Sequence, residues 1–188
     1  MRLDANFLIL VFLSTVVAAI GLVENSVPIV IGAMVLAPLL GPNLALGLGT
    51  VLGDLPLIRK SLVTTVVGIG FAVFLSALLA WEDTSPELLA RSEVGIASVA
   101  LALLPPAATL GIMLGHGHPD LASGAGLLLA VNIVCVNLAC KVVFLAKGIG
   151  PLSWSDKTGA RRKTLLAIVI WVITLALLIV AIGGREAL

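Results

Sequence analysis

The sequence predicts an all-α polytopic membrane protein, a single transmembrane domain over residues 1–188 with about six or seven transmembrane helices. Two observations predict this fold class. First, 60% of the 188 residues are hydrophobic and only 11% are charged, whereas a typical soluble domain is about 25% charged. Second, the hydrophobic residues gather in segments of about 20, the length at which a helix crosses a bilayer. A chain of this size cannot enclose so much apolar surface, so we expect lipid to cover it.

Six apolar segments are the predicted membrane helices. In chain order they are Ala5–Val23, Val27–Gly53, Ser61–Trp81, Val94–Leu114, Leu121–Ala146 and Thr164–Ile182. The first ends at the polar triplet Glu24-Asn25-Ser26, and its apolar run is longer than that of a secretory signal. Asp54, Arg59 and Lys60 form a predicted polar turn before the third segment. The last segment is rich in Leu, Ile and Val, which favours a lipid-facing helix.

The polar stretches between these segments predict the connections. Ser85 followed by Pro86 and Glu87 is typical of a helix start, which predicts a short interfacial helix over Pro86–Ser92. The stretch His116–Asp120, with the sequence HGHPD, predicts a polar turn. Residues 147–163 carry five basic side chains, and the positive-inside rule places such a loop in the cytoplasm.

Proline interrupts the second and fourth segments. It removes a backbone donor and clashes with the preceding turn, and the freed backbone groups are costly in lipid. We therefore expect both breaks to be buried in protein, where helix ends and carbonyl groups can hold a small solute or an ion. The alternative is that they are proline kinks with small residues for close packing. The candidate binding residues at the breaks are Pro38, Gly41, Pro42, Asn43, Pro105, Pro106 and Thr109.

The fifth segment adds polar candidates to the same site. Asn132 and Asn137 either point at the broken helices or form hydrogen bonds with a neighbouring helix as packing residues. Asn137 and Lys141 share one helix face, whereas Asn132 lies about 140° from Asn137 around the axis. We expect the Lys141 ammonium group to reach the cytoplasmic interface rather than to carry a buried charge.

The two broken segments resemble each other when the chain is shifted along itself by one fixed offset. Leu40 then falls on Leu104, Pro42 on Pro106, Gly47 on Gly111 and Gly53 on Gly117. This repeat offset predicts a duplication with repeat 1 at about 5–81, repeat 2 at about 94–146 and an extra C-terminal helix at 164–182. An odd number of crossings in each unit makes the two units antiparallel, which is the layout of many secondary transporters.

The predicted topology contains a conflict. The basic stretch 147–163 and the Arg59-Lys60 turn should both be cytoplasmic, and the acidic stretch 82–93 should then lie outside. Two crossings, at Val94–Leu114 and Leu121–Ala146, return the chain to the outside instead. Repeat 2 also has no counterpart of Ala5–Val23. Either the broken segment enters and leaves on one side, or a segment is missing near residues 103–104.

Several motifs resemble the membrane family called domain of unknown function 389. They are NSVPIVIGAMVLAPLLGPNLALGLGTVLGD, SPELLAR, LLPPAATLG and the NIVCVNLA helix, and the resemblance covers about residues 5–148. The family implies a multispanning inner-membrane protein of bacteria and archaea with a role related to transport and no assigned biochemical activity. Its pattern has more residues between SPELLAR and LLPPAATLG, which supply another crossing, so this chain departs from it at 100–105.

The sequence does not predict catalysis, a cofactor or a metal site. His116, His118 and Asp120 have H-x-H-x-D spacing, but a metal ion needs three or four ligands and the chain has no other histidine. No set of nucleophile and base stands out, so we expect no enzyme. The net charge of +1 gives no reason to expect nucleic acid binding. Cys135 and Cys140 lie about 140° apart on one helix, so we expect packing rather than a disulfide.

Three functions agree with these features. The first is a secondary transporter or permease for a small solute or ion, with a midplane site at the two broken helices, and the inverted repeat favours it. The alternatives are an oligomeric channel and a non-transporting membrane scaffold or sensor subunit. The expected partners are the lipid bilayer, the solute or ion, and further copies of this short chain. The expected location is the inner membrane of a prokaryote.

Overall fold

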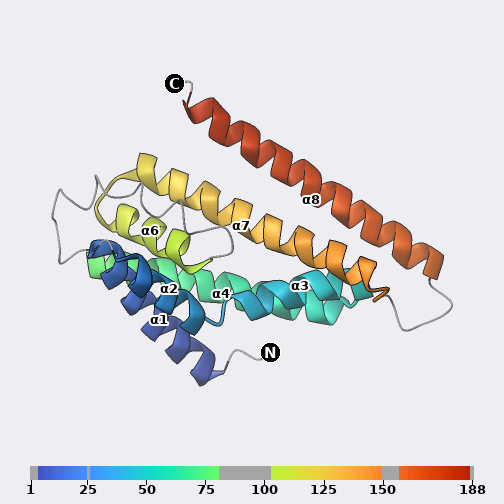
Figure 1. Cartoon of the computed structure of the whole chain (residues 1–188), viewed down its shortest axis with the longest axis horizontal. Helices are drawn as coiled ribbons and strands as arrows, with labels where there is room; N and C mark the ends of the chain where they lie inside the picture. The colour runs from blue at the N-terminus through green and yellow to red at the C-terminus, as the bar shows by residue number, and fades with distance from the viewer. Residues whose placement is uncertain (1–3, 25, 81–102, 150–156, 187–188) are drawn as a thin grey trace.

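The computed structural model describes residues 4–24, 26–80, 103–149 and 157–186, and these residues form seven helices and no strand. The side chains of the last helix are described from 166 to 180. The helices are α1 (Ala5–Val23), α2 (Val27–Leu36), α3 (Leu40–Leu52), α4 (Leu55–Ala80), α6 (Leu104–Gly115), α7 (Pro119–Ala146) and α8 (Lys157–Glu186). Figure 1 shows α7 lying across a group formed by α1, α2, α3, α4 and α6, with α8 on the outer side of α7.

Three of the described helices, α1, α4 and α7, are long and apolar enough to cross a membrane. The pair α2 and α3 passes the same test together and is bent by 53°, so it adds a fourth span if it is taken as one broken element. Two shorter apolar helical stretches, Leu104–Gly115 and Leu166–Val180, complete the set. The all-helical class is therefore confirmed, with three to four membrane-capable helices, whereas the six or seven spans stay a prediction.

Several predicted bounds agree with the helices and others are corrected. The bounds of α1 match the prediction, and α2 and α3 occupy the predicted broken segment. The prediction of a turn at Arg59 and Lys60 is wrong, because α4 already begins at Leu55, where the Asp54 carboxylate accepts a hydrogen bond from the Leu57 N–H. Lys157 and the basic residues up to 163 lie in α8 rather than in a loop. The predicted interfacial helix Pro86–Ser92 and residues 94–102 lie outside the described residues.

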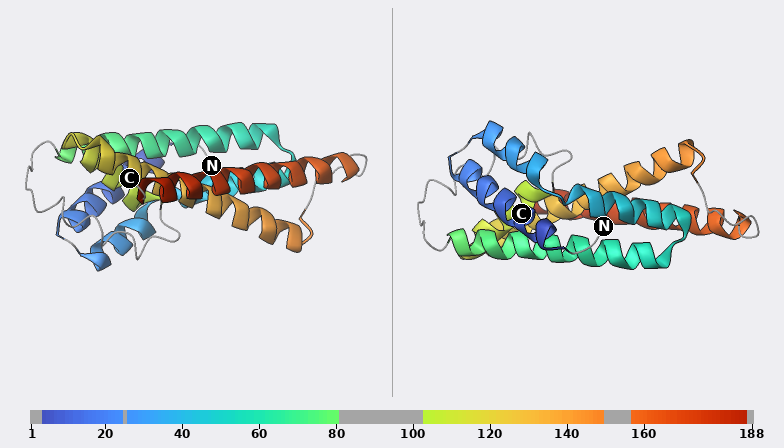
Figure 2. Two further views of the ribbon diagram at one scale, coloured as in Figure 1. Left: turned by 90° about the horizontal axis from the view of Figure 1, so that it is seen from above. Right: turned by 90° about the horizontal axis from the view of Figure 1, so that it is seen from below.

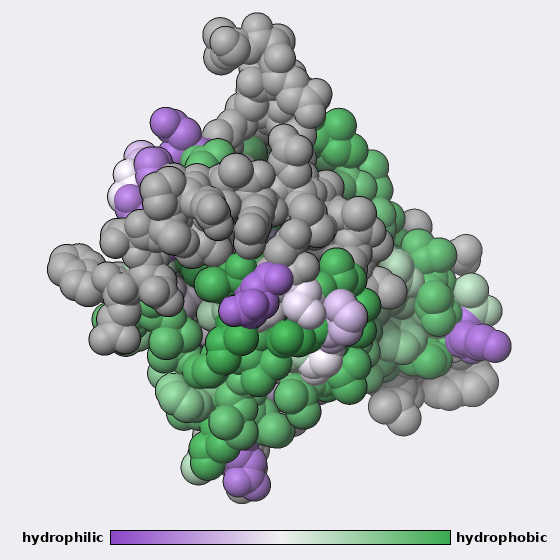
Figure 3. Space-filling view, turned by 60° about the vertical axis from the view of Figure 1, so that its left-hand side comes forward, coloured by the Kyte–Doolittle hydropathy of each residue, from purple (hydrophilic) through white to green (hydrophobic). Residues whose placement is uncertain are grey.

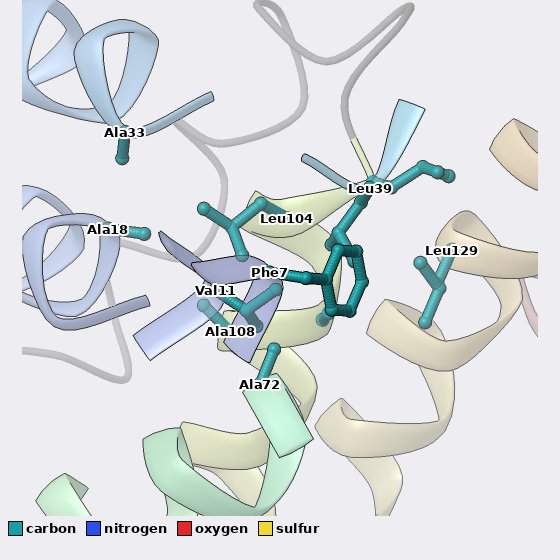
Figure 4. Close-up of a cluster of buried hydrophobic side chains, with 11 residues drawn as sticks. Phe7, Val11, Ala18, Ala33, Leu39, Ala72, Leu104, Ala108 and Leu129 are labelled. Carbon is teal, nitrogen blue, oxygen red and sulfur yellow. The ribbon is translucent and has the colours of Figure 1, made fainter. Parts of the chain in front are cut away.

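The main apolar core joins five helices and the break between α2 and α3. Figure 4 shows Leu39 from the break and Leu104 from the start of α6 in one cluster with Phe7, Val11 and Leu129. Leu39 and Leu104 are each 1% exposed. Residues of the two proline-containing segments therefore meet in the core, although Pro38 and Gly41 of the first break are only half-buried.

Glycine brings α6 and α4 into close contact. A Cβ atom at Gly111 would lie 2.7 Å from the Ser76 Cβ and against the Val73 carbonyl oxygen, and one at Gly115 would lie 2.6 Å from the Ala77 carbonyl oxygen. Small residues at i and i+4 are the usual way for membrane helices to bring their backbones together. The two views in Figure 2 show α6, in yellow-green, beside the green C-terminal end of α4.

The outer surface is mostly apolar. In Figure 3, hydrophobic residues cover most of the coloured surface, and the hydrophilic ones form a few separate spots. Among the side chains pointing outward are Val35, which is 81% exposed, and Val180, which is 71% exposed. Water does not favour such a surface, so it is compatible with a lipid environment.

Candidate functional site

The break between α2 and α3 places a polar side chain inside the protein. Ala37 ends α2 with extended backbone angles (φ −71°, ψ 119°), and Pro38 follows it. The helix α3 starts at Leu40, so Pro42 falls in its first turn, where a missing N–H removes no helical hydrogen bond. Asn43, the next residue, is fully buried. The break thus turns α3 so that Asn43 lies inside the protein.

Asn43 meets Asn137 of α7. The Asn137 side-chain amide Nδ2 donates a hydrogen bond to the Asn43 Oδ1, and both residues are fully buried. The contact is close because α3 carries Gly47 one turn after Asn43. A Cβ atom at Gly47 would lie 3.0 Å from the Cys140 Cβ and 3.7 Å from the Asn137 carbonyl oxygen. The helix α3 is therefore seated against the face of α7 that carries Asn137, Cys140 and Lys141.

Lys141 lies one turn beyond Asn137 and is also fully buried. Its Nζ lies 4.4 Å from the centroid of the Trp171 ring on α8, which is a cation–π geometry. The expectation that Lys141 reaches the interface is therefore wrong, because α8 packs over this part of α7 and covers the side chain. Asn137 and Lys141 are both fully buried, and their i, i+4 spacing in α7 places them on one face of the helix.

Three polar atoms of this Asn–Asn–Lys cluster (Asn43, Asn137 and Lys141) have no hydrogen-bond partner among the described residues. They are the Asn43 Nδ2, the Asn137 Oδ1 and the Lys141 Nζ. Buried polar groups are normally paired, and an unpaired buried charge is especially costly. The cluster therefore has an ammonium group, an amide donor and an amide acceptor that could bind a group outside the described residues.

The other candidate residues are spread more widely. Pro105 and Pro106 are buried in the first turn of α6, and Pro38, Gly41 and Thr109 are half-buried. Asn132 is buried on α7 and has an interaction partner of its own. Thr109 lies on α6, which packs against α4, α7 and α1, whereas the partner of Asn43 is Asn137. Sequence reasoning placed neither Lys141 nor Trp171 in the site, although the i, i+4 spacing of Asn137 and Lys141 was a usable signal.

The HGHPD stretch does not form a metal centre in the part of the chain described here. His116 ends α6, and its Nδ1 lies 2.8 Å from the Ile112 carbonyl oxygen. His118 stands at the start of α7, and Asp120 lies in the first turn of that helix. Among the described residues no group of three or more His, Cys, Asp or Glu side chains comes together.

The α3–α7 contact has a counterpart elsewhere in the protein, at the repeat offset that takes Leu40 to Leu104. The starts of α3 and α6 differ by this offset, and so do the starts of α4 and α7. Gly53 and Gly117 both have a left-handed backbone, with φ of 71° and 73°. In Figure 1, α4 and α7 run in opposite directions, and so do α3 and α6.

The two contacts correspond residue by residue. Gly47 of α3 faces the Asn137 carbonyl and the Cys140 Cβ of α7, and Gly111 of α6 faces the Val73 carbonyl and the Ser76 Cβ of α4. At the same offset, the counterparts of Asn43, Asn137 and Lys141 are Ala107, Val73 and Ala77. One contact is thus built from small and apolar residues, and the other buries two amides and an ammonium group at the same places.

Comparison with known proteins agrees with the motifs. A family model described as "Domain of unknown function (DUF389)" matches residues 34–104 and 93–138, which together cover more than half of the chain. The chain belongs to the DUF389 family. A relative of this DUF389 protein, "Uncharacterized protein MJ0678" from Methanocaldococcus jannaschii, is 32% identical over 202 residues, covering 91% of this chain and 63% of the relative. The chain thus spans less than two thirds of that relative's length. No solved structure matches this DUF389 chain.

The alignment with the relative also reveals a difference in length. It covers 91% of this DUF389 chain, which has 188 residues, yet it runs over 202 residues and so is longer than the whole chain. The relative therefore has residues inside the aligned region that this chain lacks. The family model matches residues 93–104 twice, once in each of its two segments.

Proposed function

We propose that this DUF389 protein is a permease that moves a small solute or ion across the membrane of a prokaryote, with its site at the Asn–Asn–Lys cluster. The observation that carries the proposal is the difference between the two corresponding contacts. Packing of a short helix on a long one needs neither a buried amide nor a buried charge, since Ala107, Val73 and Ala77 occupy the corresponding places at α6 and α4. The buried amides and the ammonium group therefore serve a role other than helix packing.

The burial of these polar groups inside an apolar protein supports a binding role. Irregular backbone and polar groups in a membrane are tolerated where they face protein or a cavity, and an ionisable residue there is by default a candidate for the transport path. The break at Pro38, the buried Asn43 and the fully covered Lys141 combine all three features. The protein acts on the solute by binding and release, and no catalytic step is part of the proposal.

The arrangement of the helices supports an inverted repeat. The opposite directions of α4 and α7, the starts of α3 and α6 at one offset, and the left-handed Gly53 and Gly117 are what a duplicated and inverted unit produces. The extra length of the alignment is enough for one spanning helix with a loop. We propose that these extra residues include a counterpart of α1, the segment that repeat 2 of this chain lacks. Six or seven spans and assembly into an oligomer belong to the same proposal.

A flux experiment tests the proposal. The purified chain is placed in liposomes and the entry of glycerol, urea, radiolabelled sodium and potassium formate with valinomycin is measured. The double variant Asn43→Ala/Asn137→Val replaces the two amides with the residues of the corresponding α4–α6 contact. We expect the wild type to admit at least one of these solutes faster than protein-free liposomes do, and the double variant to lose this entry.

A matched control separates the site from general effects of the substitutions. Asn6→Ala removes an exposed asparagine near the start of α1 and should keep the wild-type rate. If no solute enters faster with the wild type than without protein, the permease proposal is wrong. If the double variant keeps the full rate while its thermal unfolding is unchanged, the transport path lies elsewhere in the protein.

A further inference from the structure

The Asn–Asn–Lys cluster has an excess of positive charge and hydrogen-bond donors. The Lys141 Nζ carries three N–H groups and has no hydrogen-bond partner among the described residues, and the Asn43 Nδ2 adds a further unpaired donor. The only unpaired acceptor of the cluster is the Asn137 Oδ1. Exchanging the oxygen and nitrogen of both amides leaves this balance unchanged, because the pair still keeps one NH₂ group and one carbonyl oxygen.

No described carboxylate neutralises Lys141. The acidic side chains that the structure describes are Asp4, Glu24, Asp54 and Asp120, and all four are exposed. Lys141 is fully buried, and its contact is the face of the Trp171 ring. A ring face attracts an ammonium group but accepts no strong hydrogen bond from it. The Lys141 Nζ therefore still lacks a hydrogen-bond acceptor, such as an oxygen atom or an anion.

Asn43 also lies where the surrounding electrostatic potential is positive. It lies in the first turn of α3, a helix of 13 residues whose N-cap residue Leu39 makes no side-chain hydrogen bond to the helix end. The start of a helix carries a partial positive charge from its aligned peptide groups. The amide that Asn43 offers is therefore placed where the surroundings favour a negative group.

The walls of the cluster limit the size of what binds. Gly47 brings α3 so near to α7 that a Cβ atom there would lie 3.0 Å from the Cys140 Cβ. Asn43, Asn137 and Lys141 have no exposed surface at all. This close packing excludes a large ligand, and one ammonium group balances one negative charge.

We infer that the cluster binds a small monovalent anion, of the size of chloride or formate, with Lys141 as its charged contact and Asn43 as a hydrogen-bond donor. This inference rests on the proposed permease function and names its substrate class. The Asn43–Asn137 hydrogen bond holds the two amides in place, and Trp171 holds the ammonium group within the protein while the anion is absent.

Trp171 provides a direct probe of anion binding. In the variant Trp81→Phe/Trp154→Phe it is the remaining tryptophan of the three in the chain. Its fluorescence is followed while potassium formate replaces potassium gluconate at constant ionic strength, with the protein in detergent. We expect a saturable change with formate, because an anion at Lys141 alters the charge 4.4 Å from the ring centroid.

Charge variants complete the test in the same background. Lys141→Met should abolish the saturable change, Lys141→Arg should keep it, and Lys147→Met, which removes an exposed lysine at the end of α7, should leave it unaltered. Valinomycin-coupled entry of potassium formate into liposomes should fall at least tenfold in Lys141→Met. An equal saturable response in Lys141→Met, or a response in the wild type that rises linearly without saturation, overturns the inference.

The outcomes separate the inference from the function on which it rests. If glycerol, urea or sodium enters in a way that depends on the amide pair while formate neither enters nor changes the fluorescence, the permease stands and the anion inference is wrong. If formate binds and depends on Lys141 but no solute crosses, the anion site stands and the permease is wrong. If neither binding nor entry is seen, both are wrong.

Discussion

The α4–α6 contact and the α3–α7 contact are both formed around a glycine, but they bury different side chains. In each, a glycine of the shorter helix, Gly111 or Gly47, lies against the backbone of the longer one. The first contact continues into the apolar core through Ala107 and Ala108, whereas the second encloses Asn43, Asn137 and Lys141. The difference shows that close helix packing and the polar cluster are separate properties of this protein, so they should respond separately to mutation.

The largest effect is expected at the tighter contact. In Gly111→Ala the new methyl group meets the Val73 carbonyl oxygen and lies 2.7 Å from the Ser76 Cβ, and a backbone atom cannot move aside. We expect a loss of about 3 kcal/mol in the free energy of unfolding, measured as a lower midpoint of thermal unfolding in detergent. Gly70→Ala on α4 is the control, since nothing lies within 4 Å of its Cβ position. It should be neutral or stabilise by about 0.5–1 kcal/mol. Equal effects of both substitutions would mean that α6 does not approach α4 as described.

The next effect tests whether the amides depend on each other. Asn137→Val leaves Asn43 buried without its hydrogen-bond donor, which costs about 1–3 kcal/mol. The double variant Asn43→Ala/Asn137→Val removes both amides and copies the apolar contact, so most of this loss should be recovered. Thermal unfolding of the wild type, both single variants and the double variant forms a double-mutant cycle. Additive losses would show that the two side chains do not form a pair.

The comparison also shows what the sequence can and cannot predict. The bounds of α1 follow from one apolar run and the polar triplet after it, and proline and glycine mark the break before α3. The start of α4 is missed because Arg59 and Lys60 are typical of a turn, although charged side chains are also tolerated on the exposed side of a helix, as in the second turn of α4.

Asn43 and Asn137 were candidates from the sequence, but their direct contact and the burial of Lys141 were beyond sequence reasoning for a physical reason. Asn43 and Asn137 are far apart in the chain, and their hydrogen bond depends on how α3 is seated on α7. The burial of Lys141 depends on α8, whose described side chains, from 166 to 180, include none that is buried. Over these residues the sequence of α8 is apolar on all sides, so its pattern does not indicate which side of the helix packs on α7 or that Trp171 lies over Lys141. The repeat offset, in contrast, matches Gly47 with Gly111 from the sequence alone, and the two glycines do make corresponding contacts.

A smaller effect of opposite sign is expected at Lys141. The ammonium group has no hydrogen-bond partner among the described residues, so its burial lowers stability, and the ring contact with Trp171 offsets this in part. Replacing buried charges with apolar side chains is often stabilising. We therefore expect Lys141→Met to raise the free energy of unfolding by about 1–2 kcal/mol, measured by thermal unfolding without added formate. A clear loss of stability would mean that Lys141 is paired and would remove its reason to bind an anion.

The smallest effect concerns the turns that lead into α4 and α7, which correspond at the same offset. The Asp54 carboxylate accepts a hydrogen bond of 3.0 Å from the Leu57 N–H, whereas His118, its counterpart in the second repeat, makes no such bond at the start of α7. Because a carboxylate at this place satisfies one free N–H and faces the positive end of the helix, Asp54→Ala should cost about 1 kcal/mol. His118→Ala should cost close to nothing in the same thermal unfolding experiment. Asp54→Asn keeps an accepting oxygen and should recover most of the loss. Equal losses at both positions would mean that the side chain of Asp54 stabilises α4 no more than that of His118 stabilises α7, and the two turns would then be alike in energy as well as in backbone.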